Sequence, residues 1–326
     1  MSVEQKAMKE LSYKGDQIHI RHKKRNKSRM REAVEFYLFI SPWLLMFLAL
    51  GLIPLLWGLY LSFTNYTGYN FSNLSIVGLE NYKFVFTDKD AISSLLRTLL
   101  FTIMYVPLNI IVGFMLAVLL NNKLRGLSIY RTIFYLPSVI PVVATGLMWK
   151  TMYAQSDGLF NNILGHLGIK PLNWLGYGLS PSSMMFMLLW GAGGGLMIYL
   201  AGLKGVPQSL YESAAIDGAN SVQRFWKITV PFMTPLIYFN LLMSVIGALQ
   251  IFAQPMILTP GGQGLVSSPI QPIYLFMVHA WLQIFNYQRY AYGLALIWVM
   301  FIVGMALALL IHFTSKFWVH YETSGE

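Results

Sequence analysis

Six apolar segments, each long enough to cross a lipid bilayer as a helix, dominate this sequence of 326 residues. Crossing the hydrocarbon core takes about 20 helical residues, and a backbone surrounded by lipid must satisfy its hydrogen bonds internally. Only 11% of the residues are charged, whereas soluble domains contain about 25%. We therefore expect an all-α integral membrane protein with six transmembrane helices. The segments cover residues 36–63, 98–121, 130–152, 183–203, 230–257 and 290–313.

Two prolines, Pro137 and Pro141, interrupt the third of these segments. Proline removes a backbone N–H group and disturbs a helix. Membrane helices tolerate it where neighbouring groups satisfy the carbonyls that lose their partners. We therefore still expect residues 130–152 to span the membrane.

The Lys and Arg residues are unevenly distributed, and their distribution predicts the orientation of the chain. Cytoplasmic loops of membrane proteins are enriched in these residues. With the N-terminus inside, 17 of the 23 fall in cytoplasmic segments, and ten of them precede Phe36. Both termini and the loop 204–229 are therefore expected in the cytoplasm. The net charge of +10 belongs largely to a basic tail over residues 1–35, a solvated arm or one that contacts anionic lipid, and does not indicate nucleic-acid binding.

The polar segment 205–229 lies between the fourth and fifth apolar segments and is rich in small side chains. Ser209 and Glu212 have the spacing of a capping box, in which each side chain pairs with a free backbone N–H group at the start of a helix. Gly218 marks the end of that helix, because glycine tolerates a positive φ angle. We therefore expect a short capped helix, a glycine turn and a second short helix that ends at Pro231.

Seven positions of this segment stand at fixed spacings: Glu212-Ser213-Ala214, Gly218, Ile228 and Val230-Pro231. The pattern resembles the EAA motif of permease subunits of binding-protein-dependent ABC importers, which reads E-A-A, three residues, G, nine residues, I, one residue, L-P. Ser213 and Val230 are mild departures from it. The alternative, an ordinary capped loop between membrane helices, does not account for a spacing kept over about twenty positions.

In the family that this motif resembles, the loop forms a cytoplasmic coupling helix that docks into a groove on an ATPase subunit. The resemblance implies that the segment 208–222 has this role. Glu212 is expected to cap the helix or, in addition, to pair with a basic residue of the ATPase. Four of the residues, Tyr211, Ala214, Ala215 and Gly218, are expected to share the docking face. The full set of coupling residues is Tyr211, Glu212, Ser213, Ala214, Ala215, Asp217 and Gly218.

Three further motifs resemble the carbohydrate-uptake branch of these permeases. They are GLENY at 78–82, TPGG at 259–262 and YAYG at 290–293. Their order and spacing extend the resemblance over most of residues 36–315. It implies the type I ABC importer transmembrane fold, with six helices and both termini inside. It also implies import of a sugar or oligosaccharide by alternating access.

The resemblance further implies the domain organisation, the partners and the location of the chain. A permease domain is expected over residues 36–317, with its core over 93–315 and a cytoplasmic tail over 318–326. The implied partners are a second EAA-type permease, with a heterodimer favoured, two copies of an ABC ATPase, an extracytoplasmic solute-binding protein and membrane lipids. No cofactor is expected in this chain, because the partner ATPase would bind ATP and Mg²⁺. The expected location is the bacterial cytoplasmic membrane.

The chain lacks the motifs of ATP hydrolysis and of catalysis. The dipeptide Gly-Lys never occurs, so there is no phosphate-binding loop of the G-x4-G-K-[ST] type, and there is no cysteine. The interiors of the six segments contain no Asp, Glu, Lys or Arg, although proton-coupled carriers need such groups. A secondary carrier and a polytopic membrane enzyme are therefore disfavoured. A permease of the same superfamily for a glycerol phosphodiester or a polyamine remains an alternative.

The fourth and fifth segments carry the candidate sugar contacts. A sugar site combines aromatic or apolar walls with amides and hydroxyls, and the fourth segment contains the run WGAGGG at 190–195. Tight helix packing is the alternative role of these glycines. In maltose-type relatives the spans flanking the EAA loop hold the sugar, and ungapped counting from the motifs implies Trp190, Gly191, Gly194, Ser244, Ala248 and Ile251. Ala248 and Ile251 have no polar side chain, which leaves open whether this subunit or its partner holds the sugar.

Overall fold

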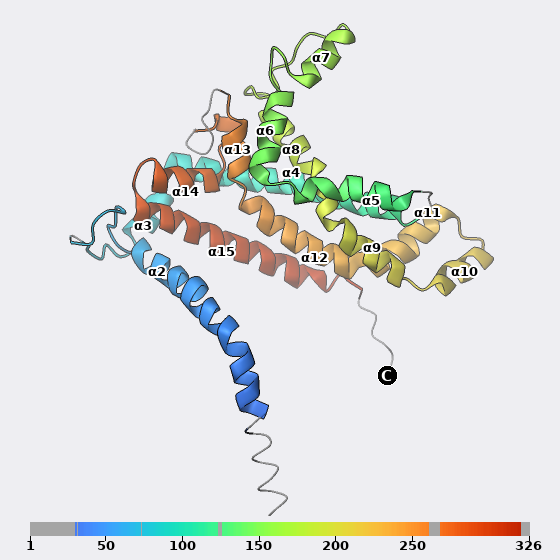
Figure 1. Ribbon diagram of the computed structural model, residues 1–326, viewed down its shortest axis with the longest axis horizontal. Helices are drawn as coiled ribbons and strands as arrows, with labels where there is room; N and C mark the ends of the chain where they lie inside the picture. Colours follow the sequence, from blue (N-terminus) through green and yellow to red (C-terminus); the bar gives the residue numbers. More distant parts are fainter. Residues whose placement is uncertain (1–29, 31, 73, 123–125, 261–267, 321–326) are drawn as a thin grey trace, which may run out of the picture. The chain divides into compact units, whose positions relative to one another are not determined.

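The computed structural model describes residues 30, 32–72, 74–122, 126–260 and 268–320. Within them the chain folds as helices joined by loops, with one isolated antiparallel bridge between Thr64 and Ile76 and no strand (Figure 1). The all-α prediction is therefore confirmed. Most of the predicted basic tail, most of the predicted C-terminal tail and the two glycines after Pro260 lie outside the described residues.

The chain divides into two units, Met1–Tyr60 and Leu61–Glu326. A helix over Glu32–Ser62 makes up the described part of the first unit and covers the first predicted span. A π-helical stretch over Phe47–Leu52 precedes its last part, α2 (Ile53–Ser62). Only 6% of its most apolar stretch is buried. Its side chains therefore suit a surrounding of lipid or of another protein.

Three long helices form the body of the second unit: α4 (Lys89–Leu120), α12 (Val230–Leu249) and α15 (Tyr290–Ser315). α12 packs against both α4 and α15, and the three lie side by side (Figure 1). Asp88 begins α4, because its carboxylate accepts hydrogen bonds from two backbone N–H groups of the first turn at 2.9 and 3.4 Å. These helices confirm the second and sixth predicted spans.

The third predicted span is sharply broken. It consists of α5 (Leu127–Tyr135), the 3₁₀ turn η2 (Leu136–Val139) and α6 (Val142–Met152), and the two halves meet at 99°. The break falls between the two prolines. Ile140 is extended, as expected for a residue before proline, and Pro141 begins α6. If this bent pair is counted as one span, the described residues contain six candidate spans, and otherwise five.

The fourth predicted span also breaks near its middle. Its halves, α8 (Ser180–Trp190) and α9 (Leu196–Gly205), are separated by the 3₁₀ turn η3 (Ala192–Gly195). η3 packs against the break of the third span. A Cβ atom on Gly193 would overlap the backbone carbonyl oxygen of Phe134. Only glycine therefore allows the two broken spans to touch here.

The fifth predicted span has different limits from those expected. Its helix runs over Ser221–Leu249, which includes α11 (Ser221–Arg224) and a π-helical stretch, η4 (Phe225–Thr229). After a short break the chain forms the separate helix α13 (Ala253–Leu258). The prediction of one helix over 230–257 is therefore wrong at both ends. The apolar composition continues across the break, so hydropathy alone did not reveal it.

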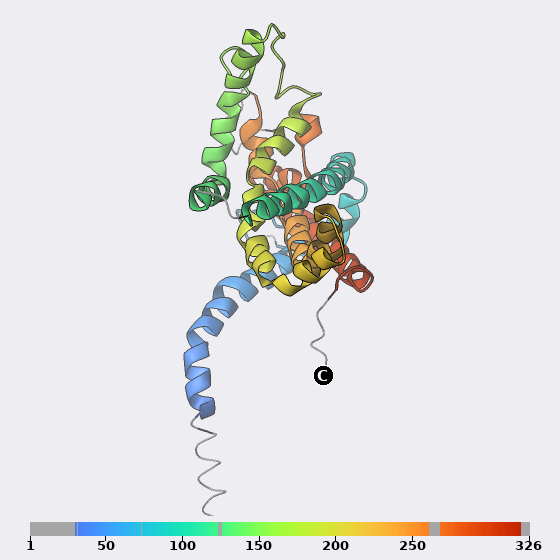
Figure 2. The ribbon, with the colours of Figure 1, turned by 90° about the vertical axis from the view of Figure 1, so that its right-hand side faces the viewer.

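The outer parts of the third and fourth spans pack against each other. α7 (Leu159–His166), in the loop between them, stands away from α4, α12 and α15 in both views (Figures 1 and 2). The hydroxyl of Tyr153 donates to the backbone oxygen of Ser183 at 2.8 Å, and the Asn161 side chain bonds the backbone of Leu172 in both directions. The rings that pack in this region are Trp149, Tyr153, Phe160, Trp174, Phe186 and Trp190.

α10 and α11 lie at one end of the body, and α3 lies at the opposite end (Figure 1). We call the end with α10 and α11 the inner end, and the opposite end the outer end, after the predicted topology. The topology itself stays a prediction. The remaining helices are α3 (Glu80–Val85), α10 (Gln208–Ile216), η6 (Gln271–Ile273) and α14 (Phe276–Phe285).

Candidate functional site

The helix α10 contains the predicted coupling residues, but it does not begin as predicted. Its N-cap is Pro207, and no side chain caps it. Ser209 lies inside the first helical turn instead of before it, so the predicted capping box with Glu212 is wrong. The physical reason is that Pro207, with φ −59° and ψ 128°, already provides the extended residue from which a helix starts. Glu212 is exposed, and its pairing with an ATPase residue stays a prediction.

The end of α10 is closed by backbone hydrogen bonds around Gly218. Its φ angle is +81°, so the prediction of a left-handed turn at this glycine is confirmed. The N–H of Ala219 donates to the oxygen of Ala214 at 2.8 Å, and that of Gly218 to Ala215 at 3.1 Å, the Schellman arrangement. No atom lies within 4 Å of a Cβ built on Gly218. The glycine is therefore required by the backbone conformation and not by packing.

A capping box does occur in this segment, but at the next helix. The side chain of Asn220 accepts from the backbone N–H of Gln223 at 2.8 Å, and the Gln223 side chain accepts from the N–H of Asn220 at 2.9 Å. The sequence analysis missed this pair, although Asn followed three residues later by Gln is the pattern it sought. Two local caps therefore define the turn between α10 and α11.

The predicted docking face of α10 is divided in the structure. Tyr211 and Ala214 are half-buried, whereas Ala215 and Gly218 are exposed. The hydroxyl of Tyr211 is 2.8 Å from that of Thr229. This hydrogen bond connects α10 directly to the start of the fifth span. The other predicted coupling residues, Ser213 and Asp217, are exposed.

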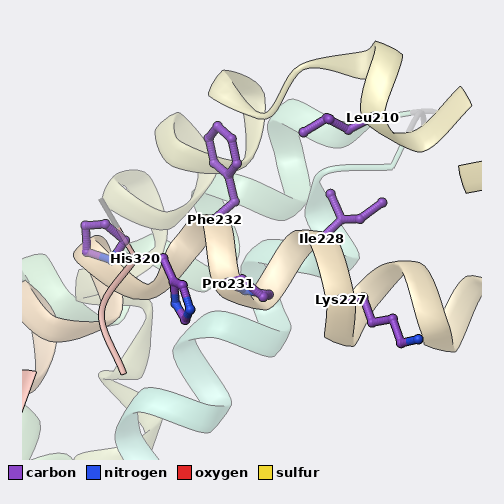
Figure 3. A pocket seen from close by; sticks show the side chains of 7 residues that line it. Leu210, Lys227, Ile228, Pro231, Phe232 and His320 are labelled. Carbon is purple, nitrogen blue, oxygen red and sulfur yellow. The ribbon is translucent and has the colours of Figure 1, made fainter. Parts of the chain in front are cut away.

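Apolar side chains are also exposed on the inner end, and the sequence analysis did not select them. Ile216, at the end of α10, is 87% exposed, and Val222 and Trp226 are 66% and 63% exposed. Beside α10 lies a hollow of about 440 Å³, in which Figure 3 shows side chains from α10, η4 and α12. Exposed apolar groups of this kind indicate a protein contact. The hollow is lined by Leu210, Lys227, Ile228, Pro231, Phe232, Pro235 and His320.

A polar pocket of about 140 Å³ lies where the glycine-rich break of the fourth span meets α4 and α12. Its polar side chains are two amides and three hydroxyls, and none of its lining residues is charged. The amide of Asn109 donates to the hydroxyl of Ser244 at 3.2 Å, which joins α4 to α12. The pocket is lined by Tyr105, Asn109, Ile110, Gly191, Ala192, Gly194, Gly195, Tyr199, Asn240 and Ser244.

The structure brings together half of the predicted sugar contacts. Gly191, Gly194 and Ser244 line the pocket. Trp190 precedes it and packs edge-on against the ring of Trp149, with the ring centres 5.9 Å apart. Ala248 and Ile251 do not line it, since both are buried in the apolar core. The helix face drawn through Ser244, Ala248 and Ile251 therefore does not form one wall of the site, because the α-helix ends at Leu249.

Tyr199 is a pocket residue with a buried hydroxyl that makes no hydrogen bond in the described structure. Its side chain is 2% exposed, and its hydroxyl has no hydrogen-bond partner among the described residues. A buried polar group without a partner is costly. The sequence analysis missed Tyr199 and also Tyr105 and Asn109, although the last two are four residues apart on one face of an apolar helix. A polar pair at helical spacing was the signal available there.

A network of buried polar side chains joins four segments at the outer end. The hydroxyl of Tyr292 donates to Asp88 at 2.7 Å, and Nε2 of His279 lies 3.3 Å from the same carboxylate oxygen. The hydroxyl of Tyr274 is 2.9 Å from Nδ1 of His279. Burial lowers the pKa of His279 below its ordinary value, although Asp88 and Asp90 oppose this. Burial raises the pKa of Asp88, but hydrogen bonds from Tyr292 and the backbone, with His279, lower it overall.

The helical body, its uncharged pocket at the break of the fourth span and the exposed helix α10 at one end are the features of a membrane transport component. The family model described as "Binding-protein-dependent transport system inner membrane component" matches residues 109–319. The chain therefore belongs to this family, and the predicted family is confirmed. It is a transport subunit and not an enzyme, and it is a multi-pass protein of the bacterial inner membrane.

Individual relatives agree with this assignment. The probable ABC transporter permease protein YesP of Bacillus subtilis (strain 168) is 38% identical over 310 residues, covering 93% of this chain and 97% of that protein. The trehalose/maltose transport system permease protein MalF of Thermococcus litoralis is 35% identical over 244 residues, covering 73% and 81%. A solved bacterial ABC transporter that imports the acidic polysaccharide alginate has the same fold, with a TM-score of 0.78, 22% identity and coverage of 90% and 98%.

Proposed function

We propose that this chain forms half of the translocation pathway of an ATP-driven importer for a sugar or an oligosaccharide. The observation that carries the proposal is the pocket around Gly194, whose polar groups are neutral amides and hydroxyls. Such groups match the hydroxyls of a saccharide, and the tyrosine rings match its apolar faces. A relative named as a trehalose/maltose permease covers 73% of the chain at 35% identity, which supports the same class of solute.

The charge of the pocket disfavours the alternative solutes. A glycerol phosphodiester is an anion and a polyamine is a cation, and both would need an opposite charge when they leave water. None of the ten residues lining the pocket provides one. The pocket would therefore accept a neutral sugar more readily than either ion.

We also propose that α10 transmits the motion of an ATPase subunit to the spans. Its exposed residues would dock on the ATPase, which binds ATP and Mg²⁺, and Tyr211 would pass the movement to the fifth span through Thr229. Two ATPase copies, a second EAA-type permease and an extracytoplasmic solute-binding protein would complete the transporter. Binding of the loaded solute-binding protein would favour one of two openings of the pathway.

The test is uptake of a panel of neutral saccharides, with polyamines as comparison solutes, by cells that express the complete transporter. Gly194→Trp should fill the pocket and abolish uptake while the complex still assembles, because only the side chain of Ser138 lies near a Cβ at this position. Gly178→Trp is the matched control, since nothing lies within 4 Å of that Cβ and Gly178 is outside the pocket. Normal uptake by the Gly194 variant would contradict the proposed site, and uptake of polyamines alone would contradict the solute class.

A further inference from the structure

A second cavity, separate from the polar pocket, lies between α4 and α8 towards the outer end. Its volume is about 340 Å³, within the range of roughly 300–1,000 Å³ that is common for ligand sites. The positions that each helix contributes follow the spacing of one helical face over two turns. α4 contributes Arg97, Leu100, Phe101 and Met104, α8 contributes Ser182, Met185, Phe186 and Leu189, and Pro181 and Pro272 complete the lining.

The walls of this groove are apolar and open to the surroundings. Leu100 and Met104 are 61% and 60% exposed on α4, and Phe186 is 55% exposed on α8. α4 begins at the outer end, and the groove follows it from Arg97 to Met104, towards the middle of this helix. An apolar groove open along membrane helices is suited to an acyl chain, because each buried methylene group contributes favourably.

The outer part of the groove holds a single positive charge, Arg97, in a fixed position. Its guanidinium donates to the backbone oxygen of Ser93 at 3.1 Å and to the Ser93 hydroxyl at 2.6 Å. It also donates to the backbone oxygens of Gln271 and Tyr274. These acceptors are all neutral, and no ion pair to Arg97 occurs within the described part of the chain. An arginine keeps its charge at any physiological pH, so this charge is held but not neutralised.

We propose that this groove binds an anionic phospholipid of the outer leaflet, with the phosphate at Arg97 and an acyl chain between α4 and α8. The unpaired positive charge of Arg97 attracts a phosphate, and its Nη2 keeps one N–H that the bonds to Ser93, Gln271 and Tyr274 do not use. A free phosphate would make no use of the apolar walls. These walls extend away from Arg97, as an acyl chain extends away from its headgroup. A helix of the partner permease would need an acidic residue beside Arg97, as well as apolar side chains, to satisfy both halves. A phospholipid satisfies both halves of the groove.

The groove joins α4 to α8, the half of the fourth span that precedes its break. α4 belongs to the long helical body, whereas α8 precedes the turn η3 and packs with the outer aromatic cluster. A bound lipid would hold α8 against α4 on the outer side of this turn. The inference does not depend on the identity of the imported solute.

The direct test is the count of lipids retained by the complete transporter in native mass spectrometry. Delipidated complex is titrated with dioleoylphosphatidylglycerol or with dioleoylphosphatidylcholine, which have the same chains. Wild type should prefer the anionic lipid, and Arg97→Gln should weaken its retention by roughly tenfold without changing the zwitterionic lipid. Arg289→Gln, at another outer position, is the matched control. Equal retention by wild type and Arg97→Gln, or an equal loss in the control, would overturn the proposal.

Two further measurements keep the test decisive if Arg97→Gln fails to fold. Glycerol phosphate, a headgroup without chains, should not displace the lipid from wild type, and displacement would indicate a site for free phosphate instead. Because the chain has no cysteine, Met185→Cys introduces a thiol that is unique within it. A fluorophore attached there should be quenched by phosphatidylglycerol with brominated chains. Absence of quenching, or cross-linking of this thiol to the partner permease, would show that protein covers the groove.

Discussion

The proposed coupling segment, α10 and α11 at the inner end, and the interior of the helical body are stabilised in different ways. Around α10 and α11, the hydrogen bonds that define the turn connect residues at most five positions apart, and most side chains are exposed. In the interior, the broken third and fourth spans meet through backbone contact at Gly193. At the outer end, the network at Asp88 also joins residues about 200 positions apart in sequence.

This difference predicts two kinds of response to mutation. A change in the coupling segment strains a local turn whose surroundings are open, so the rest of the protein should remain folded. A change in the interior meets neighbours that cannot move without disturbing several helices. Mutations in the proposed coupling segment should therefore reduce transport, whereas mutations in the interior should reduce the stability of the protein.

The largest expected effect is that of Gly193→Ala, because the added Cβ would overlap the backbone oxygen of Phe134. A backbone neighbour cannot rotate away, and overpacking of this kind costs about 3 kcal/mol. The purified transporter should show a clearly lower thermal midpoint and a poor yield. Gly194→Ala is the control, since its Cβ would be 3.6 Å from the Cβ of Ser138, an ordinary contact. Similar midpoints for the two variants would contradict the packing argument.

The second effect should fall on function alone. Gly218→Val places a β-branched residue at a φ angle of +81°, which costs roughly 1–3 kcal/mol in the turn. The end of α10 should shift, and uptake should fall about tenfold or more if the turn must hold its shape for coupling. Insertion in the membrane and the thermal midpoint should stay close to wild type.

The control for this variant is Gly205→Val, at the end of α9, where the φ angle is not positive and nothing lies within 4 Å of the Cβ. It should retain uptake. If Gly218→Val transports at the normal rate with normal expression, the segment is not the coupling element.

The third effect concerns pH and the network at the outer end. The pKa of His279 is lowered in the folded protein. On acidification the unfolded chain therefore binds a proton at this residue at a higher pH than the folded chain does. The free energy of unfolding is for this reason greatest above the ordinary His value of 6.5. Stability should fall as the pH drops from about 6.5 towards the lower pKa of the folded state. The lowered pKa of Asp88 adds a second loss of stability only below its ordinary value of 3.8.

This prediction is checked by thermal unfolding of the purified transporter between pH 7.5 and about 5. The midpoint of wild type should decrease on acidification, and His279→Gln should decrease less. A wild-type midpoint that rises on acidification would show that His279 is charged in the folded protein and paired with Asp88.

The smallest effect expected on stability is that of Tyr199→Phe. The variant removes a buried hydroxyl that has no partner in the described structure, so the thermal midpoint should stay the same or rise by an amount that reflects about 1 kcal/mol. Sugar affinity should nevertheless fall several-fold, because this hydroxyl is available for a ligand. Tyr211→Phe is an informative comparison, since it removes the hydrogen bond to Thr229 but leaves the pocket intact. Unchanged sugar affinity in Tyr199→Phe would remove this residue from the site.

The sequence alone predicted the features that depend on composition and on short-range spacing. Hydropathy located most of the spans, and the EAA spacing identified the family. The positive φ angle of Gly218 followed from residue type, because few residues other than glycine adopt that conformation without strain. The start of α10 was predicted incorrectly, since Ser209 and Pro207 offered competing local starts.

Tertiary structure alone decided where the fifth apolar span breaks and which distant residues meet. Breaks within uniformly apolar segments leave no trace in hydropathy, so the end of α12 at Leu249 and the burial of Ala248 and Ile251 were not predicted. Tyr105, Asn109 and Tyr199 reach one pocket because α4, η3, α9 and α12 pack around it. The physical reason is that local patterns determine how a helix forms and ends, whereas a site between helices depends on their packing angles and register, which the whole set of contacts determines together.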